Sequence, residues 1–251
     1  MRQNSVKEIW RDGGVAYGAW LMIPSAVSAE ALAREGYDYV CVDMQHGLIG
    51  YETALAMLQS ISATESMPFV RVPANDFATI GKMLDAGAMG VIIPMVNSAA
   101  EAREAVRACR YFPKGARSWG PTRATMYAGA DYYPNADDEV ACIPMIETKQ
   151  AVDALDEILA VAGIDCAYVG PSDLSVTLGL PPGPDNDGAF EEARLLIARK
   201  CKEHGVVAGM HANASLAAKH RAAGYQMITI SADLSALTQR AATDLRVARE
   251  P

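Results

Sequence analysis

Short apolar runs of strand length alternate with longer amphipathic stretches along the whole chain. The apolar runs are continuous, which is typical of parallel strands buried on both faces. The stretches between them have helical spacing, and several end in a glycine suited to a left-handed C-terminal cap. The predicted strands are 15–23, 37–43, 68–72, 91–96, 141–146, 164–169, 206–210 and 225–230. The predicted helices are 29–35, 52–63, 77–86, 99–109, 151–161, 191–203, 216–222 and 234–247.

Eight strand–helix units predict an α/β chain folded as a single (β/α)8 TIM barrel over residues 1–251. An open doubly wound sheet is the alternative, but the sequence has no glycine-rich dinucleotide fingerprint to favour it. Two longer connections, 114–138 and 172–188, break the regular spacing. We expect both near the active face or its rim, as functional lids, partner surfaces or ordered surface excursions.

The composition is that of an ordinary globular protein, with 51% hydrophobic and 21% charged residues. The net charge of −8 gives no basic surface for nucleic acid or an anionic membrane. The N-terminus is polar and no apolar run approaches the ~18 residues of a membrane span, so we expect a cytoplasmic protein. The five cysteines lack metal-type spacing and are expected to be structural.

Acidic and basic side chains follow several of the predicted strands directly. In a parallel barrel the carboxyl ends of all strands meet on one face, so these side chains are expected to share one pocket. An active site is therefore the leading interpretation of the pattern. The residues are Asp43, His46, Arg71, Glu147 and Asp173.

Glu147 and Asp173 lie just beyond the fifth and sixth predicted strands, which are neighbours. Two carboxylates without thiolate or clustered imidazole partners suit a hard cation such as Mg²⁺ or Mn²⁺ and leave positions open for substrate oxygens. Such a cation acts as a Lewis acid on a carbonyl. Alternatively, both acids lie near helix N-termini, where the helix dipole favours negative charge without any metal.

Arg71 ends the third predicted strand, where its guanidinium would bind a carboxylate or a developing enolate. A structural salt bridge across the barrel is the alternative. His46 stands near Asp43, and a histidine close to a carboxylate suits a general base. A satisfied histidine at the rim is equally consistent with this position.

The other histidines and the lysines carry less information. His211 also ends a strand and is a weaker candidate for lining the pocket, while His204 and His220 lie on helices and are expected at the surface. No lysine falls within a predicted strand. Because a Schiff-base mechanism needs a desolvated lysine, activation of a carbonyl by a metal is the favoured route.

Five motifs together resemble the HpcH/HpaI aldolase family of metal-dependent, class II pyruvate aldolases. The resemblance runs from about Gly18 to Leu234. Two positions depart from the family pattern: Met145 stands where many members have glutamine, and Gln45 where an acid often precedes the histidine. The motifs are residues 43–47, 71–73, 84–94, 146–148 and 170–175.

The resemblance implies specific roles for these residues. Glu147 and Asp173 would bind a divalent metal (Mg²⁺, Mn²⁺ or Co²⁺), and Arg71 would hold the pyruvate part of the substrate. His46 would be the base, working with Asp43. The backbone of the segment Gly170, Pro171, Ser172 and Asp173 would bind the substrate carboxylate.

The resemblance also implies an assembly. Asp85 would contribute to the site of a neighbouring subunit, and family members commonly form homohexamers with the last helix packed on a partner. Packing within one subunit would use the same apolar stripe equally well. The stripe consists of Leu234, Leu237, Ala241 and Leu245.

The resulting hypothesis is a carbon–carbon lyase that reversibly cleaves 4-hydroxy-2-oxo acids to pyruvate and an aldehyde through a metal-stabilised pyruvate enolate. An acyl-CoA lyase like the related citrate lyase β-subunit is one alternative, and it would need a basic surface for the phosphates of CoA. A noncatalytic oxo-acid-binding protein is another. The two departures from the family pattern, Gln45 and Met145, leave the aldehyde open.

Overall fold

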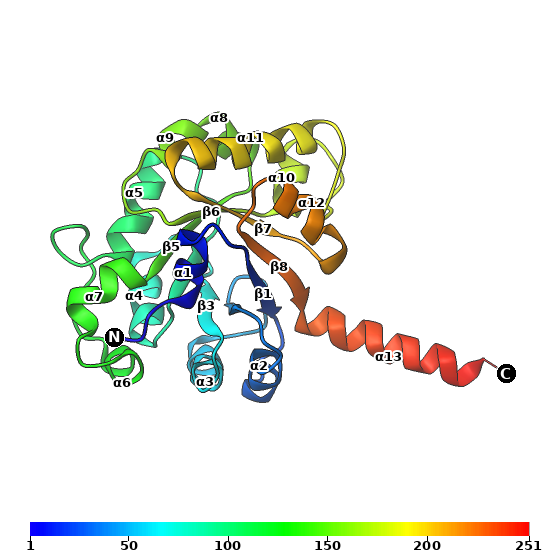
Figure 1. The fold of residues 1–251 in the computed structure, drawn as a ribbon, viewed down its shortest axis with the longest axis horizontal. Coiled ribbons are helices and arrows are strands. Elements are labelled where there is room, and N and C mark those ends of the chain that lie inside the picture. The colour runs from blue at the N-terminus through cyan, green and yellow to red at the C-terminus, as the bar shows by residue number, and fades with distance from the viewer. Residues whose placement is uncertain (251) are drawn as a thin grey trace.

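A computed structural model describes residues 1–250 and confirms the predicted barrel (Figure 1). Eight parallel strands close in sequence order, β1 through β8 and back to β1. The strands are β1 (Ala16–Leu21), β2 (Tyr39–Asp43), β3 (Met67–Arg71), β4 (Gly90–Ile93), β5 (Ala141–Ile146), β6 (Cys166–Val169), β7 (Val207–His211) and β8 (Met227–Ala232).

Helices surround the barrel, and short additional helices lie in the connections (Figure 1). They are α1 (Ser5–Arg11), α2 (Ala26–Ala33), α3 (Tyr51–Ser62), α4 (Phe77–Asp85), α5 (Ala99–Cys109), α6 (Thr122–Ala128), α7 (Tyr132–Glu139), α8 (Lys149–Asp153), α9 (Leu155–Leu159), α10 (Pro171–Thr177), α11 (Ala189–His204), η1 (Ala214–Leu216), α12 (Ala217–Ala222) and α13 (Asp233–Arg249).

Successive strand residues point to opposite faces, and this period decides which side chains reach the barrel interior. On β2, Val40 and Val42 pack outward against the helices, whereas Tyr39 and Cys41 pack inward. On β5, Ile143 and Met145 likewise point inward. The next inward positions in this period are Asp43 after Cys41 and Glu147 after Met145. The alternation therefore places these two carboxylates at the open end of the barrel interior.

Inward-facing glycines make room for large aromatic side chains inside the barrel. A Cβ on Gly18 would lie 2.1 Å from the Tyr39 ring, and a Cβ on Gly209 would lie 2.6 Å from the Tyr168 ring. Both contacts are far shorter than van der Waals distance, so these positions require glycine. Tyr39 and Tyr168 are thus held in fixed places below the carboxyl ends of the strands.

The structure differs from the prediction in several connections. Helix α1 was not expected; it is short, but it buries Val6 and Trp10 against the barrel. The predicted helix 151–161 is divided into α8 and α9 at Ala154, whose φ and ψ of −98° and 14° are not helical. Part of the connection 172–188 is helix α10, which begins at Pro171 with the fixed φ that favours a first turn.

The connection 114–138 lies at the opposite end of the barrel from the one expected. It joins α5 to β5 and therefore lies at the amino ends of the strands, where α6 packs beside α4 and α7 packs beside α6. Arg117 at its centre is buried and donates hydrogen bonds to Tyr132 and Asp85. It is an ordered excursion in this chain and covers no part of the pocket described below.

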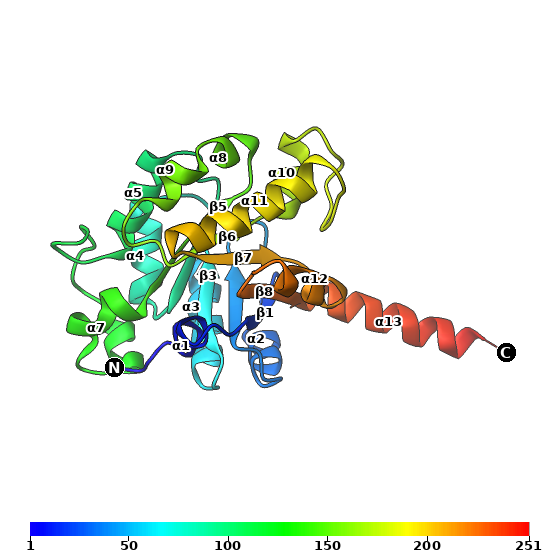
Figure 2. The same ribbon diagram turned by 45° about the horizontal axis from the view of Figure 1, so that its top comes forward.

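The last helix, α13, projects away from the barrel instead of packing on it (Figures 1 and 2). Its contacts are with β1 and β8, next to its first turn. The side chains of Leu237, Leu245 and Val247 are 52–60% exposed. No helix within residues 1–250 is long and apolar enough to cross a bilayer.

The five cysteines are free and buried, as expected for structural residues. The helix-closing glycines also behave as predicted: Gly87 after α4 and Gly205 after α11 have φ of 98° and 69°. His220 corrects the sequence prediction, because it is fully buried against Tyr225 and not at the surface.

Candidate active site

A cavity of about 220 Å³ opens at the carboxyl end of the barrel and brings together almost all of the predicted site residues. Residues a hundred or more positions apart line it, as the barrel topology predicted. The predicted residues in its wall are Asp43, His46, Arg71, Glu147, Gly170, Pro171, Ser172, Asp173 and His211. The wall also contains Trp20, Met22, Met145 and Ala232.

Asp43 and Arg71 form a buried, bidentate ion pair. They face each other in the register of β2 and β3, and Arg71 donates from Nε to Asp43 Oδ1 (2.8 Å) and from Nη2 to Oδ2 (2.6 Å). Burial raises the pKa of Asp43, but the hydrogen bonds and charge of Arg71 outweigh it and hold the pKa below its usual value. Both groups are therefore charged near neutral pH, and Arg71 brings a fixed positive charge to the cavity.

Trp20 supports this pair from β1. Its indole Nε1 donates to Asp43 Oδ2 (3.1 Å), and the Arg71 guanidinium lies over its ring, 5.0 Å from the centroid. Within residues 1–250, Nη1 of Arg71 makes no hydrogen bond to the protein. Because Asp43 and Trp20 fix the guanidinium, this nitrogen is positioned to meet an anion in the cavity.

His46 lies in the loop after β2 and is exposed. Its link to Asp43 is through its backbone N–H, which donates to Oδ1 (3.3 Å) together with the N–H of Gln45 (3.0 Å). Asp43 thus shapes the loop that carries the histidine. The expected contact between the carboxylate and the imidazole is not made in this chain, since Arg71 occupies the carboxylate.

Glu147 follows β5 and is almost completely buried beside the cavity. The backbone N–H of Met95 donates to Oε1 (2.7 Å), while Oε2 packs against Gly170, where a Cβ would lie 2.3 Å away. Burial, together with the charge of Asp173, raises the pKa of Glu147 to about 7 against the lowering effect of the Met95 N–H. Gly170 therefore gives this carboxylate the space to face Asp173.

The loop that holds Glu147 is itself fixed by hydrogen bonds. Met95 has a left-handed backbone (φ 56°), an uncommon conformation for a non-glycine residue. Asn97 donates to the Met95 carbonyl (2.9 Å) and also hydrogen-bonds to Thr148. Since Thr148 follows Glu147 in sequence and caps α8, these contacts close a ring around the glutamate. The ring fixes the direction in which the Met95 N–H points.

These residues fit a hard divalent cation with an open coordination sphere. Two carboxylates, Glu147 and Asp173, border one cavity, and their mutual repulsion raises the pKa of Glu147, a cost that a cation between them would relieve. In the part of the chain that the structure describes, no cluster of three or more His, Cys, Asp or Glu side chains has a metal-binding arrangement. A closed tetrahedral zinc site is therefore a poor match, whereas Mg²⁺ or Mn²⁺ commonly uses one or two carboxylates plus water and substrate.

Sequence reasoning gave no role to Trp20, Met22 and Ala232 in the wall. Trp20 points to the barrel interior from β1, as Asp43 does from β2. The alternation of inward and outward residues along β1 could therefore have identified it from the sequence. Met145, one of the two departures from the family pattern, also lines the cavity.

Asp85 does not reach this cavity. It ends α4 at the amino-terminal side of the barrel, where it accepts a hydrogen bond from Arg117 Nη2 (2.8 Å). Its contribution to the site of a neighbouring subunit stays a prediction.

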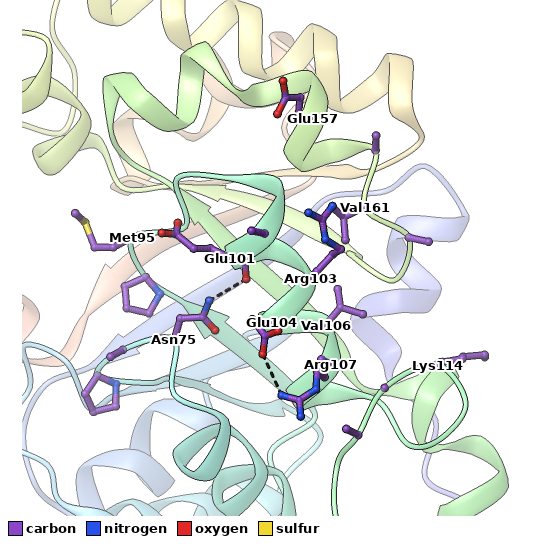
Figure 3. A pocket seen from close by; sticks show the side chains of 18 residues that line it. Asn75, Met95, Glu101, Arg103, Glu104, Val106, Arg107, Lys114, Glu157 and Val161 are labelled. Atoms are coloured by element: carbon purple, nitrogen blue, oxygen red, sulfur yellow. Dashed lines mark hydrogen bonds and ion pairs between the residues drawn. The ribbon is translucent and has the colours of Figure 1, made fainter.

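A larger cavity of about 1180 Å³ lies beside α5 and contains none of the predicted site residues (Figure 3). Two of its charged side chains are paired nearby, Arg107 with Glu104 (3.0 Å) and Lys114 with Asp138 (3.2 Å), and Asn75 donates to the Glu101 backbone carbonyl (2.9 Å). Met95 lies between the two cavities, because its side chain lines the larger one and its N–H reaches Glu147. The smaller cavity, which has the convergent charged groups, is the better candidate.

Comparison with known proteins gives one consistent family. Residues 16–239 match the family model described as HpcH/HpaI aldolase/citrate lyase. A hydroxypyruvate/pyruvate aldolase from Rhizorhabdus wittichii is 39% identical over 243 residues, covering 95% of this chain and 96% of that protein. A 4-hydroxy-2-oxo-heptane-1,7-dioate aldolase from Escherichia coli is 36% identical, covering 95% and 92%. The crystal structure of an HpcH/HpaI family protein from Burkholderia cenocepacia superimposes with a TM-score of 0.92 at 35% identity, covering 98% and 100%.

Proposed function

Because the chain belongs to the HpcH/HpaI aldolase/citrate lyase family, we propose that it is a divalent-metal-dependent aldolase that reversibly cleaves 4-hydroxy-2-oxo acids to pyruvate and an aldehyde. The observation that carries the proposal is the cavity itself. It combines a fixed guanidinium, Arg71, with two converging carboxylates, Glu147 and Asp173, at the open end of a barrel. This is the donor set that a 2-oxo acid and a hard cation require.

Each residue contributes a defined part of the reaction. The backbone N–H groups at Ser172 and Asp173, in the first turn of α10, bind the substrate carboxylate, because the first N–H groups of a helix lack intrahelical partners. Glu147 and Asp173 would hold the cation. When bound, the cation supplies positive charge at the 2-oxo acid oxygens.

Arg71 and His46 act on the bond that breaks. His46 accepts the proton of the C4 hydroxyl, the C3–C4 bond breaks, and its electron pair becomes the enolate of pyruvate. Arg71, fixed by Asp43 and Trp20, stabilises the negative charge of that enolate without reorganising, which is how a preorganised site lowers a barrier. The carbon at C4 leaves as the aldehyde, and return of the proton from the His46 imidazolium, directly or through water, to C3 gives pyruvate and restores the base.

The alternatives receive less support. A CoA thioester would need a basic surface, but the chain carries a net charge of −8 and the one arginine in the cavity wall is paired with Asp43. A noncatalytic binding protein would have no need for a buried glutamate with a raised pKa beside a second carboxylate. The full set of His46, Arg71, Glu147 and Asp173 argues for turnover.

The test is release of pyruvate, followed by a coupled assay, from a panel of 4-hydroxy-2-oxo acids with and without a chelator. We expect release that needs a divalent metal, and the panel identifies the preferred aldehyde. Glu147→Gln should abolish release, whereas the control Glu157→Gln, at the exposed wall of the larger cavity, should not. Cleavage of an acyl-CoA substrate with no pyruvate release from any member of the panel would refute the proposal.

We also propose that α13 packs on a second copy of this chain, in keeping with the homohexamer that the resemblance implies. An isolated helix of 17 residues is marginal in water, and α13 leaves Leu234, Leu237 and Leu245 46–60% exposed on one face. Leu237→Glu should lower the oligomeric state measured by analytical ultracentrifugation, while Thr243→Glu on the opposite face should not. An unchanged assembly in both variants would exclude the stripe as the interface.

A further inference from the structure

His211 is a polar group in the cavity wall to which the proposed mechanism gives no task. It ends β7 on the inward-facing side and packs edge-on against Trp20, with ring centroids 4.9 Å apart at 85°. Its Nδ1 lies 3.4 Å from the hydroxyl of Tyr168. Its Nε2 makes no hydrogen bond to the protein within residues 1–250, yet is not sealed from solvent, so it opens onto the cavity.

Below His211, three buried hydroxyl groups form a chain through the barrel interior. Tyr39 lies 2.9 Å from Thr229 Oγ1, and Tyr168 lies 2.5 Å from the same oxygen. All three side chains are fully buried. The chain therefore runs from Tyr39 through Thr229 and Tyr168 to Nδ1 of His211.

The number of hydroxyl hydrogens determines which group donates and which accepts along this series of hydrogen bonds. Each hydroxyl has one hydrogen, and in the described residues the Tyr39 hydroxyl has no partner other than Thr229. A buried donor left unpaired is costly, so Tyr39 must donate to Thr229. Thr229 then donates to Tyr168, and Tyr168 donates to Nδ1 of His211. In the reverse direction the Tyr39 hydrogen would point at no acceptor.

The same direction assigns the tautomer of His211. Because Nδ1 accepts, the hydrogen of the neutral imidazole resides on Nε2, the nitrogen that faces the cavity. Burial, together with the charge of Arg71, lowers the pKa of His211 to about 4, which is consistent with a neutral ring. The cavity thus contains a neutral N–H donor whose orientation is set by residues deep in the barrel.

We propose that His211 donates this Nε2–H hydrogen bond to an uncharged oxygen in the aldehyde-derived part of the substrate, so that the enzyme prefers aldehydes bearing a hydroxyl or oxo group. This rests on the proposed aldolase function. Arg71 and the cation site bind the charged end of a 2-oxo acid. The neutral Nε2–H of His211 instead suits a neutral oxygen. Met22, Met145 and Ala232, which also line the cavity, have no comparable donor.

The tautomer is tested directly by ¹⁵N NMR of the imidazoles in histidine-labelled protein, with His211→Leu to identify the signal. We expect a pyridine-type Nδ1 and a pyrrole-type Nε2 for His211. Tyr168→Phe should shift both nitrogens toward an averaged tautomer. The control Tyr225→Phe removes another buried hydroxyl, which donates to the Arg194 carbonyl, and should leave them unchanged. A protonated Nδ1 in the wild type would overturn the assignment.

Selectivity is tested with glycolaldehyde and propanal, which differ by a hydroxyl in place of a methyl group, each condensed with pyruvate. The wild type should favour glycolaldehyde in kcat/KM, and His211→Leu should reduce that preference about 3- to 10-fold, as loss of one neutral hydrogen bond predicts. Tyr168→Phe should weaken it and Tyr225→Phe should not. An unchanged ratio of kcat/KM for glycolaldehyde over propanal in His211→Leu would overturn the proposed contact. Failure of every aldehyde to react would instead overturn the aldolase function, and the NMR result would not be affected.

Discussion

The buried carboxyl of Glu147 makes the metal-free protein less stable as the pH rises. Its pKa in the folded state is about 7, raised by burial and by Asp173 from an ordinary value of 4.5. Below pH 4.5 the group is protonated in both the folded and the unfolded states and has no effect. Between pH 4.5 and 7 the unfolded chain loses the proton first, so the free energy of unfolding falls, and above pH 7 the full penalty is present.

The size of this penalty follows from the shift. At about 1.4 kcal/mol per pKa unit, it reaches about 3 kcal/mol at pH 8 and above. Glu147→Gln keeps an oxygen that accepts from the Met95 N–H but cannot ionise. The variant should therefore match the wild type near pH 4.5 and exceed it by about 3 kcal/mol at pH 8, or roughly 6–12 °C in Tm for a chain of this size.

Urea unfolding in the presence of EDTA from pH 4.5 to 8.5 measures the difference between the two proteins. The control Glu192→Gln, on the exposed face of α11, should show no such rise. Added Mn²⁺ should stabilise the wild type and not Glu147→Gln, because binding to the folded state alone raises stability. A difference between wild type and variant that does not change with pH would refute the reasoning.

Three further outcomes are expected. Asp43→Asn removes the counter-charge of buried Arg71 and should lower the free energy of unfolding, measured by urea unfolding, by about 3–5 kcal/mol. A loss below about 1 kcal/mol would show that the buried ion pair is not critical for stability. Arg71→Ala should abolish both aldol cleavage and solvent exchange of the pyruvate methyl protons followed by NMR, whereas His46→Ala should retain exchange and lose ~100- to 10,000-fold in cleavage. If His46→Ala cleaves at the wild-type rate, another group is the base. Chelation should abolish activity and Mg²⁺, Mn²⁺ or Co²⁺ restore it, while borohydride with pyruvate should trap no lysine, since none lines the cavity.

The barrel and the shared pocket could be predicted because apolar runs of strand length alternate with stretches of helical spacing along the sequence. Continuous apolar runs marked buried parallel strands, and parallel strands bring their carboxyl ends to one face. The period of two within each strand would also have pointed to Trp20, whose parity matches that of Asp43 and Arg71. The pairing of Asp43 with Arg71 depends on the register between β2 and β3, which no single strand's pattern contains.

The placement of α13 could not be predicted, and that of residues 114–138 was predicted at the wrong end of the barrel, for two further reasons. An amphipathic helix shows the same apolar stripe whether it packs on its own barrel or on another chain, so Leu237 and Leu245 do not distinguish the two. The connection 114–138 was rich in aromatic and charged residues, a composition shared by lids and by ordered excursions. Its position between the predicted helix 99–109 and the predicted strand 141–146, and so at the amino ends of the strands, was the signal that separates the two.

The site divides into residues fixed by the barrel and residues on its loops. Arg71 is fixed by Asp43 and Trp20, and His211 is oriented by Tyr168, so these groups are set before substrate arrives. His46 and Asp173 are exposed and have no comparable side-chain partner within residues 1–250. Since Asp43 is occupied by Arg71, we expect the group that orients the His46 imidazole to come from the substrate, the cation site or a neighbouring subunit. In the proposed reaction, the charge that stabilises the enolate would therefore be built into one chain, whereas the proton-transfer geometry would be completed on binding or assembly.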